Sequence, residues 1–176
     1  MKRTVYVISG PAGVGKSTTS KKLAKQLERS SYISGDTISH LPINGRGKPW
    51  LCRDTHNLTW ENILSLTRNL VEYDFDVVID YVSFPREVHW LADKLKDKNV
   101  DIVYVVLMVD RDTIVKRDES RNPEIQMGER SLILLKEFEE ALLDNAQHIL
   151  NTQEYSVEQL DEIIDEIINN KQKYLI

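Results

Sequence analysis

The segment Ile8–Ser20 reads ISGPAGVGKSTTS, and Gly10–Ser17 within it has the spacing G-x-x-x-x-G-K-S. This spacing is a complete Walker A pattern. Its glycines allow the backbone to curl so that successive N–H groups point inward at an anion. A helix beginning near Lys16 adds the positive end of its dipole at the same point. The pattern therefore predicts a loop that holds the phosphates of a nucleotide.

The residues on either side of the loop fit this prediction. Thr4–Ser9 is short, apolar and rich in β-branched residues, as in a buried strand, and Lys16–Glu28 has apolar residues at helical spacing. Lys16 can place its charge on the β- and γ-phosphates, and Ser17 can offer a hydroxyl to Mg²⁺. The predicted ATP-binding residues of this segment are Gly10, Pro11, Ala12, Gly13, Val14, Gly15, Lys16, Ser17 and Thr18.

Farther along the chain, expected strands and helices alternate. We expect strands at 31–34, 76–82, 100–109 and 148–152, and helices at 16–28, 58–73, 85–97, from 111, 128–146 and 156–170, with Thr59 and Ser156 as N-caps. Most of these strands are apolar on both faces, which favours an α/β fold with a parallel sheet covered on both sides. We treat residues 1–176 as one domain and residues 41–57 as a loop or broken helix.

Composition narrows the possible partners. The chain has 176 residues, a net charge of −5 and no dense run of Lys or Arg, so neither a nucleic-acid groove nor a lipid surface is expected. No apolar stretch is long enough to cross a membrane, and no signal-peptide pattern is present. Cys52 is the only cysteine, which fits a reducing, cytoplasmic location. We expect a monomer or a homodimer.

The motifs of a GTP-dependent switch are missing. No Asp is followed by Gly three residues later, and the only Asn-Lys pair is Asn170-Lys171. The chain instead resembles the P-loop small-molecule kinases, such as the gluconate, shikimate, chloramphenicol and nucleotide kinases of the P-loop NTP hydrolase superfamily. The likeness covers most of the chain, although only the Walker A element is specific. It implies a three-layer fold with a five-stranded parallel sheet of order 2-3-1-4-5, helices on both faces and an arginine-bearing lid.

Two aspartates lie at the ends of apolar stretches within or beside predicted strands. Asp36 ends the second strand, where a carboxylate can take the proton from an acceptor hydroxyl, and it resembles the Asp that serves as base in chloramphenicol and shikimate kinases. It could instead cap a short helix beginning at Thr37. Asp80 ends the apolar run VVID and resembles a Walker B carboxylate that holds Mg²⁺, or it could pair with a lysine. The two aspartates could also exchange these roles.

Further substrate contacts are expected on the acceptor side. Arg86 lies in DYVSFPR, which resembles the DGFPR of adenylate-kinase-like enzymes with two extra residues, so it either grips a phosphate or lies on a helix surface. His40 and Arg53 flank an insert that also contains Arg46, Lys48 and Trp50. This composition suits either a polar or anionic acceptor or a solvated loop. We interpret Trp60 as core, and His56, His89 and His148 as structural or solvated residues.

The segment 117–130 resembles the lid of small kinases. Arg117 and Arg121 are four residues apart and share one helix face, and Arg130 follows a loop with Pro123 and Gly128. Lid arginines spread charge onto the oxygens of the transferring phosphoryl group. The alternative is surface ion pairing with Asp118 and Glu119. After the fifth strand, Asn151 and Thr152 resemble the loop that lines the adenine.

These features together predict an enzyme, an ATP- and Mg²⁺-dependent phosphotransferase. The acceptor would be a hydroxyl-bearing small molecule, such as a sugar acid, a shikimate-like acid or an antibiotic-like compound. The predicted catalytic residues are Lys16, Asp36, Arg117 and Arg121. A nucleotide or nucleoside kinase is the alternative within enzymes. An ATP-binding regulatory protein without an acceptor is the alternative of another class.

Overall fold

The computed structural model of the chain describes residues 2–176, apart from the side chains of Ile125 and Val157. A single sheet runs through these residues, with its strands in the order β2-β3-β1-β4-β5 and every neighbouring pair parallel. The strands are Arg3–Ser9 (β1), Ser30–Ser34 (β2), Asp76–Asp80 (β3), Val100–Met108 (β4) and Ile149–Asn151 (β5). The predicted α/β fold with strand order 2-3-1-4-5 is confirmed.

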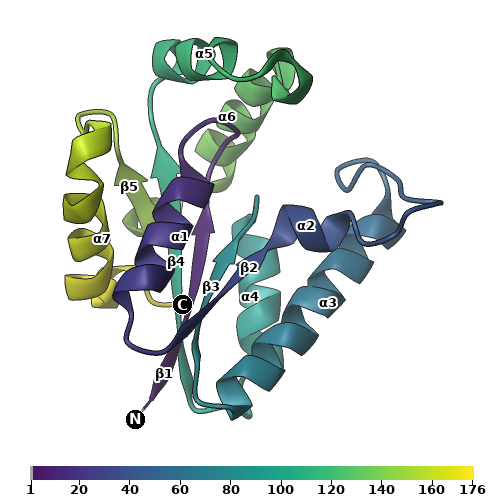
Figure 1. Ribbon diagram of the computed structural model, residues 1–176, viewed down its shortest axis with the longest axis vertical. Coiled ribbons are helices and arrows are strands. Elements are labelled where there is room, and N and C mark those ends of the chain that lie inside the picture. The colour runs from purple at the N-terminus through teal and green to yellow at the C-terminus, as the bar shows by residue number, and fades with distance from the viewer. Residues whose placement is uncertain (1) are drawn as a thin grey trace.

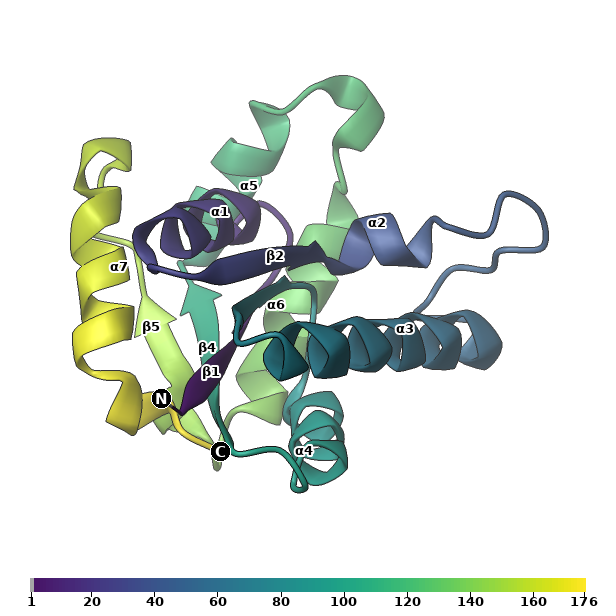
Figure 2. The same cartoon turned by 60° about the horizontal axis from the view of Figure 1, so that its bottom comes forward.

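Helices cover both faces of this sheet (Figure 1, Figure 2). Helices α1 and α7 lie on one side, and α3, α4 and α6 lie on the other, which gives three layers. The α-helices are Lys16–Gln26 (α1), Gly35–Ser39 (α2), Arg53–Glu72 (α3), Pro85–Lys94 (α4), Arg111–Glu119 (α5), Glu129–Ala141 (α6) and Leu160–Asn169 (α7). None of the helices in the described residues combines the length and apolar character needed to cross a membrane.

The core follows the central strands. Val5, Val7 and Ile8 of β1 are fully buried, as are the apolar residues of β3 and the middle of β4. Strands that are apolar on both faces suit a parallel sheet between two helical layers. Because the strands are parallel, the carboxyl ends of β1, β2 and β3 meet at one edge. The pairing there sets Ile8 beside Asp80 and Ser34 beside Asp80. This edge positions the functional residues.

The last residues of the chain pair with β4, on the part of this strand that β5 does not reach. Strand β5 pairs only with Val106–Met108, at the end of β4. Leu175 forms an antiparallel bridge with Val103, and the Ile176 N–H donates to the Ile102 carbonyl at 3.0 Å. The carboxyl-terminal residues therefore cover the length of β4 that β5 leaves free. Nearby, Asp101 pairs with Lys2 near one end of the chain and Lys171 near the other.

Two local expectations were wrong. The expected start of the second long helix at residue 58 is five residues late, because α3 begins at Arg53. Thr59 is not its N-cap but a buried residue within the helix, where its hydroxyl donates to the Thr55 carbonyl at 2.7 Å. The irregular insert expected at residues 41–57 consequently ends at Cys52.

Candidate active site

The Walker A segment lies between β1 and α1, as predicted. Gly10 has a φ of 136°, and a Cβ at this position would lie 2.4 Å from the Leu107 carbonyl oxygen of β4. Only glycine fits both this conformation and this close approach. The Lys16 ammonium folds back over the loop and donates to the Pro11 carbonyl at 2.9 Å. The loop therefore has the curled form that presents its amides to an anion.

Lys16 also marks the centre of a charged cluster. Burial lowers the pKa of its ammonium to about 8, although Asp80 and Asp36 partly oppose this effect. The Arg121 charge lowers the pKa further. Both predicted carboxylates and one predicted lid arginine therefore act on the Lys16 ammonium, which places all four groups in one region of the molecule.

Asp80 is the carboxylate predicted to hold Mg²⁺. It is buried at the end of β3, and its Oδ2 accepts a hydrogen bond from the Tyr32 hydroxyl at 2.7 Å. Ser17 also lies close enough to the Tyr32 hydroxyl to affect its pKa. A hydroxyl and one carboxylate, completed by phosphate oxygens and water, are the donors that Mg²⁺ prefers. Ser17 and Asp80 therefore fit the predicted metal-holding role.

Asp36 lies on α2, beside the end of β2. The helix begins at Gly35, and its N-cap is Ser34, whose hydroxyl accepts from the Thr37 N–H. The alternative in which Asp36 caps a helix starting at Thr37 is therefore wrong. Gly35 packs against the Tyr81 ring, where a Cβ would approach ring carbon Cγ to 2.2 Å. Burial and the Asp36 charge together raise the pKa of Tyr81 to about 12.

The segment 117–130 forms an ordered turn against the P-loop. Arg117 donates from Nη1 to the Val14 carbonyl at 3.1 Å. Asp118 is buried, accepts hydrogen bonds from the Met127 and Gly128 backbone N–H groups at 3.0 and 2.7 Å, and lies 3.4 Å from Arg121. The ion pair considered above is therefore present between Arg121 and Asp118, but the Asp118 carboxylate is buried and also anchors the segment through the Met127 and Gly128 N–H groups.

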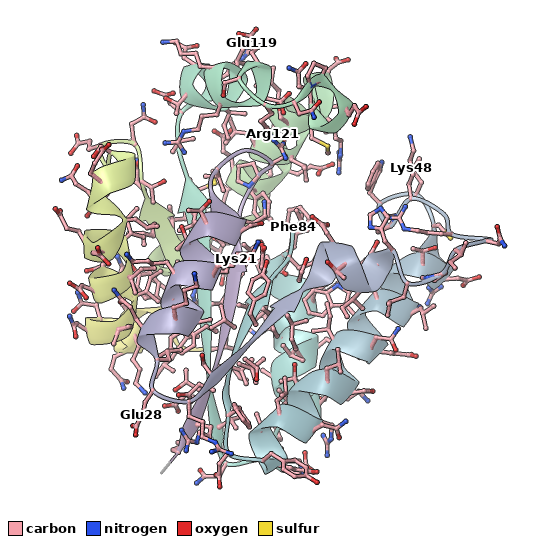
Figure 3. The ribbon with its side chains drawn as sticks, viewed as in Figure 1. Lys21, Glu28, Lys48, Phe84, Glu119 and Arg121 are labelled. Atoms are coloured by element: carbon pink, nitrogen blue, oxygen red, sulfur yellow. The ribbon has the colours of Figure 1, made fainter. Side chains whose placement is uncertain are left out.

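These parts surround one cavity of about 1020 Å³. Its nucleotide half is lined by the P-loop, by Arg117 and Arg121, and by Thr152 and Tyr155 after β5. Its acceptor half is lined by α2, the insert 41–52, the first turn of α3, the β3–α4 connection and α6. Figure 3 labels three of the lining residues: Arg121 on the lid segment, Phe84 on the β3–α4 connection and Lys48 on the insert.

Not every predicted site residue lines the cavity. Lys16, Ser17, Asp36, His40, Arg130 and Thr152 do, but Arg53, Arg86 and Asn151 do not. Arg86 is exposed on α4, where it pairs with Glu87 at 3.0 Å. Arg53 is exposed at the start of α3, and exposed Asn151 accepts from the Gln153 N–H. Asp80, buried at the end of β3, is also not among the lining residues.

The structure adds residues that the sequence did not single out. Glu87 is buried, its Oε2 accepts from the Phe84 N–H at 2.9 Å, and its Oε1 lies 3.5 Å from His56 Nε2. His56, interpreted above as structural or solvated, lines the acceptor half. Pro85 at the first helical position, followed by Glu87 at the third, is a sequence signal for a helix start in which the Glu side chain accepts from the N-cap N–H. It marks Glu87 as a cap but not as part of a cavity.

The β1–loop–α1 unit on a parallel sheet of this order defines a P-loop domain with a small-molecule-kinase-like fold, and such a domain implies nucleotide binding. The chain belongs to the family described as AAA domain (AAA_33), whose model matches residues 5–142. No curated protein matches it in sequence.

Several solved structures share the fold over nearly the whole chain. A gluconokinase from Sinorhizobium meliloti 1021 matches with 18% identity and a TM-score of 0.66, covering 98% of this chain and 94% of its own. The APS kinase CysC from Mycobacterium tuberculosis has 17% identity and a TM-score of 0.67, with 96% of each chain covered. A tunicamycin resistance protein from Deinococcus radiodurans has 17% identity and a TM-score of 0.65, covering 95% and 96%. Identities this low establish likeness of fold.

Proposed function

We propose that the protein is an ATP-dependent phosphotransferase that moves the γ-phosphoryl group to a hydroxyl of a small molecule. The observation that carries this proposal is the shared cavity, which joins the P-loop to Asp36 and to Arg117 and Arg121. A nucleotide and a second small molecule need adjoining sites for direct transfer. The likeness of fold to gluconate and APS kinases supports the same reaction class.

The nucleotide would be held by the P-loop. The N–H groups of the P-loop and the start of α1 would bind the phosphates. Lys16 would replace its hydrogen bond to the Pro11 carbonyl with one to a phosphate oxygen. Ser17 and Asp80 would hold Mg²⁺, which supplies neutralisation of the β- and γ-phosphate charge. Thr152 and Tyr155 line the cavity after β5, where the adenine of the nucleotide would lie.

Transfer then depends on Asp36 and the arginines. Asp36 is exposed to the cavity and takes the proton of the acceptor hydroxyl as its oxygen bonds to the γ-phosphorus. The bond from that phosphorus to the β,γ-bridging oxygen breaks, and ADP leaves with the electron pair. Arg117 and Arg121 stabilise the charge on the transferring oxygens, a role in which an arginine is worth roughly 10³ to 10⁵ in turnover.

The test separates transfer from nucleotide binding. Asp36→Ala is expected to lower acceptor-dependent ATP consumption at least about 100-fold, while the Kd for Mg-ATP stays within a few-fold of the wild type. Lys16→Ala should impair both. Asp165→Ala, an exposed position on α7, is the matched control. Wild-type activity in the Asp36 variant would contradict the proposal and favour a regulatory ATP-binding protein.

A further inference from the structure

We infer that the acceptor is a hydroxyl compound with a flat apolar body and no net negative charge, and that Trp50 closes over this body. The inference rests on the proposed function and concerns the acceptor half of the same cavity. It comes from two properties of that half: which walls are apolar, and which of its charged groups are already paired.

One wall of the acceptor half is apolar and held in place. Phe84, Met127 and Leu134 line it from the β3–α4 connection, the end of the lid segment and α6. The Phe84 ring stacks on the fully buried Phe138 ring, with centroids 4.5 Å apart and planes at 24°. Phe84 is therefore fixed from behind and presents its other face to the cavity. A fixed apolar face gains most from a ligand that covers it and excludes water.

The opposite wall comes from the insert. Pro49 and Trp50 line the cavity there, and the Trp50 side chain is half-exposed. The Lys48 ammonium lies 5.7 Å from the centroid of its ring, and the Arg130 guanidinium lies 5.6 Å from it. Because Arg130 belongs to α6, Trp50 connects the insert to the helix that follows the lid segment. A flat body bound between the walls would shield this indole from water.

The charges of the acceptor half do not favour an anionic body. Arg130 is paired in bidentate fashion with Glu137 at 2.9 and 3.1 Å, so a carboxylate already neutralises it. Arg46 is fixed on Ser39 through the backbone carbonyl at 2.6 Å and the hydroxyl at 2.8 Å. Recognition of a carboxylate or phosphate usually uses guanidinium groups free for two parallel hydrogen bonds.

Two carboxylates also face this half. Asp36 and Glu87 both line it, and Glu87 is buried. Glu87 is already paired with Arg86 at 3.0 Å and accepts from the Phe84 N–H, whereas the Asp36 carboxylate is exposed to the cavity. A bound anion would be repelled by Asp36, to which a neutral compound can donate a hydrogen bond. Lys48 lies at the exposed mouth, where its charge is screened by solvent. The half is therefore amphipathic, with hydrogen-bond acceptors on one side and apolar rings on the other.

The experiment compares two sets of probes in an ATP-consumption assay, with mass spectrometry of the products. One set has a flat ring, hydroxyls and no net negative charge: adenosine, uridine and chloramphenicol. The other has an anionic body: gluconate and shikimate. We expect phosphorylation within the first set only. Trp50→Ala should raise KM for that acceptor about tenfold or more while kcat and the Kd for Mg-ATP stay within a few-fold. Trp50→Phe should restore most of the loss.

Leu51→Ala is the matched control, because Leu51 is the neighbouring exposed residue and does not line the cavity. A wild-type KM in Trp50→Ala overturns the inference, as does phosphorylation of the anionic set alone. In both of these cases the proposed kinase function stands. Absence of phosphorylation in both sets, with Mg-ATP still bound, overturns the inference and removes support for the proposed function too.

Discussion

At the level of single residues, Lys16 ties nucleotide binding to pH. Burial brings its pKa down to about 8 in the free protein, so its charge is present below that pH and is lost as the pH rises above it. Only the charged form attracts phosphate. We expect the affinity for Mg-ATP to be flat near pH 7 and to fall by up to about tenfold per pH unit above pH 8.

Calorimetry between pH 6.5 and 9.5 would measure this decline. Lys16→Arg provides the comparison, because a guanidinium remains charged over the whole range. The arginine variant should show a nearly flat affinity even if it binds more weakly. Equal slopes in the two proteins would assign the pH dependence to another group.

Tyr32 bears on the proposed metal site. Burial and the hydrogen bond to Asp80 raise the pKa of Tyr32, so its hydroxyl remains a donor at neutral pH. Tyr32→Phe removes this donor and leaves the buried Asp80 carboxylate free to turn. We expect the apparent affinity for Mg²⁺, titrated in the presence of a non-hydrolysable ATP analogue, to weaken about three- to tenfold, within the range for a lost hydrogen bond to a buried charge.

Nucleotide binding measured in EDTA should be unchanged in Tyr32→Phe. Tyr73→Phe, at an exposed tyrosine, is the control. Equal losses with and without Mg²⁺ would mean that Tyr32 supports the fold of the P-loop rather than the orientation of Asp80.

The sequence predicts single residues when their signal is local. The Walker A residues are contiguous, and Asp36 and Asp80 lie toward the carboxyl ends of predicted strands, so their shared edge follows from the topology. Tyr32 and Asp118 carry no such signal. Tyr32 meets Asp80 across 48 residues of sequence, and the burial of Asp118 depends on how a ten-residue segment folds back.

At the level of elements, the lid segment is organised by Asp118. Burial raises the pKa of this carboxyl, but the N–H donors of Met127 and Gly128 and the Arg121 charge outweigh that effect, and the pKa is lowered from 3.8. A depressed pKa means that the contribution to stability is complete at neutral pH and is lost only in acid, as the carboxyl protonates.

Asp118→Ala leaves two backbone donors without their acceptor. We expect a loss of about 1–3 kcal/mol in the free energy of unfolding and a Tm lower by several degrees. Hydrogen exchange should accelerate at the Met127 and Gly128 amides and not in β4. Glu119→Ala, at the exposed neighbour, should change neither. Unaltered exchange in Asp118→Ala would refute the anchoring role.

Element boundaries were predicted less well than element types. The start of α3 has no standard side-chain cap, because the Sγ of its N-cap Cys52 accepts from the Thr55 hydroxyl, at 3.4 Å, rather than from a backbone N–H of the first turn. Tertiary contacts set it instead: Thr55 Oγ1 accepts from the Gly47 N–H of the insert at 3.0 Å. A start defined by a folded-back loop leaves no local sequence pattern, so the sequence indicates Thr59, next to the apolar stripe, as the cap.

At the level of the whole molecule, the sheet order agreed with the family resemblance, and the apolar strands correctly predicted a sheet covered on both faces. The acceptor half could not be predicted in the same way. It is assembled from α2, the insert, the first turn of α3, the β3–α4 connection and α6. Its contacts between elements, such as Glu87 of α4 with His56 of α3, become visible only when those elements are placed together.

Removing Leu175 and Ile176 should weaken the whole sheet. These residues pair with β4 where β5 is absent, and their loss exposes strand edge and the partly buried Leu175 contacts. We expect a loss of about 1–2 kcal/mol, a Tm lower by about 3–6 °C and more light scattering on heating, since a bare strand edge favours association. Gln172→Ala, at an exposed position nearby, should behave like the wild type. Full stability after truncation would contradict this account.

The clamp formed by Asp101 with Lys2 and Lys171 has an engineering consequence. It joins Lys2 and Lys171, near the two ends of the chain, to one carboxylate, and Figures 1 and 2 show the N and C labels in the same part of the molecule. A short glycine-serine linker could therefore join the two ends, and new ends could be opened at the exposed tip of the insert around Ile43–Gly45. Such a circular permutant would keep the strand order of the sheet but would break the chain in the insert that lines the proposed acceptor half. Its activity would show whether the proposed phosphotransfer requires a continuous insert.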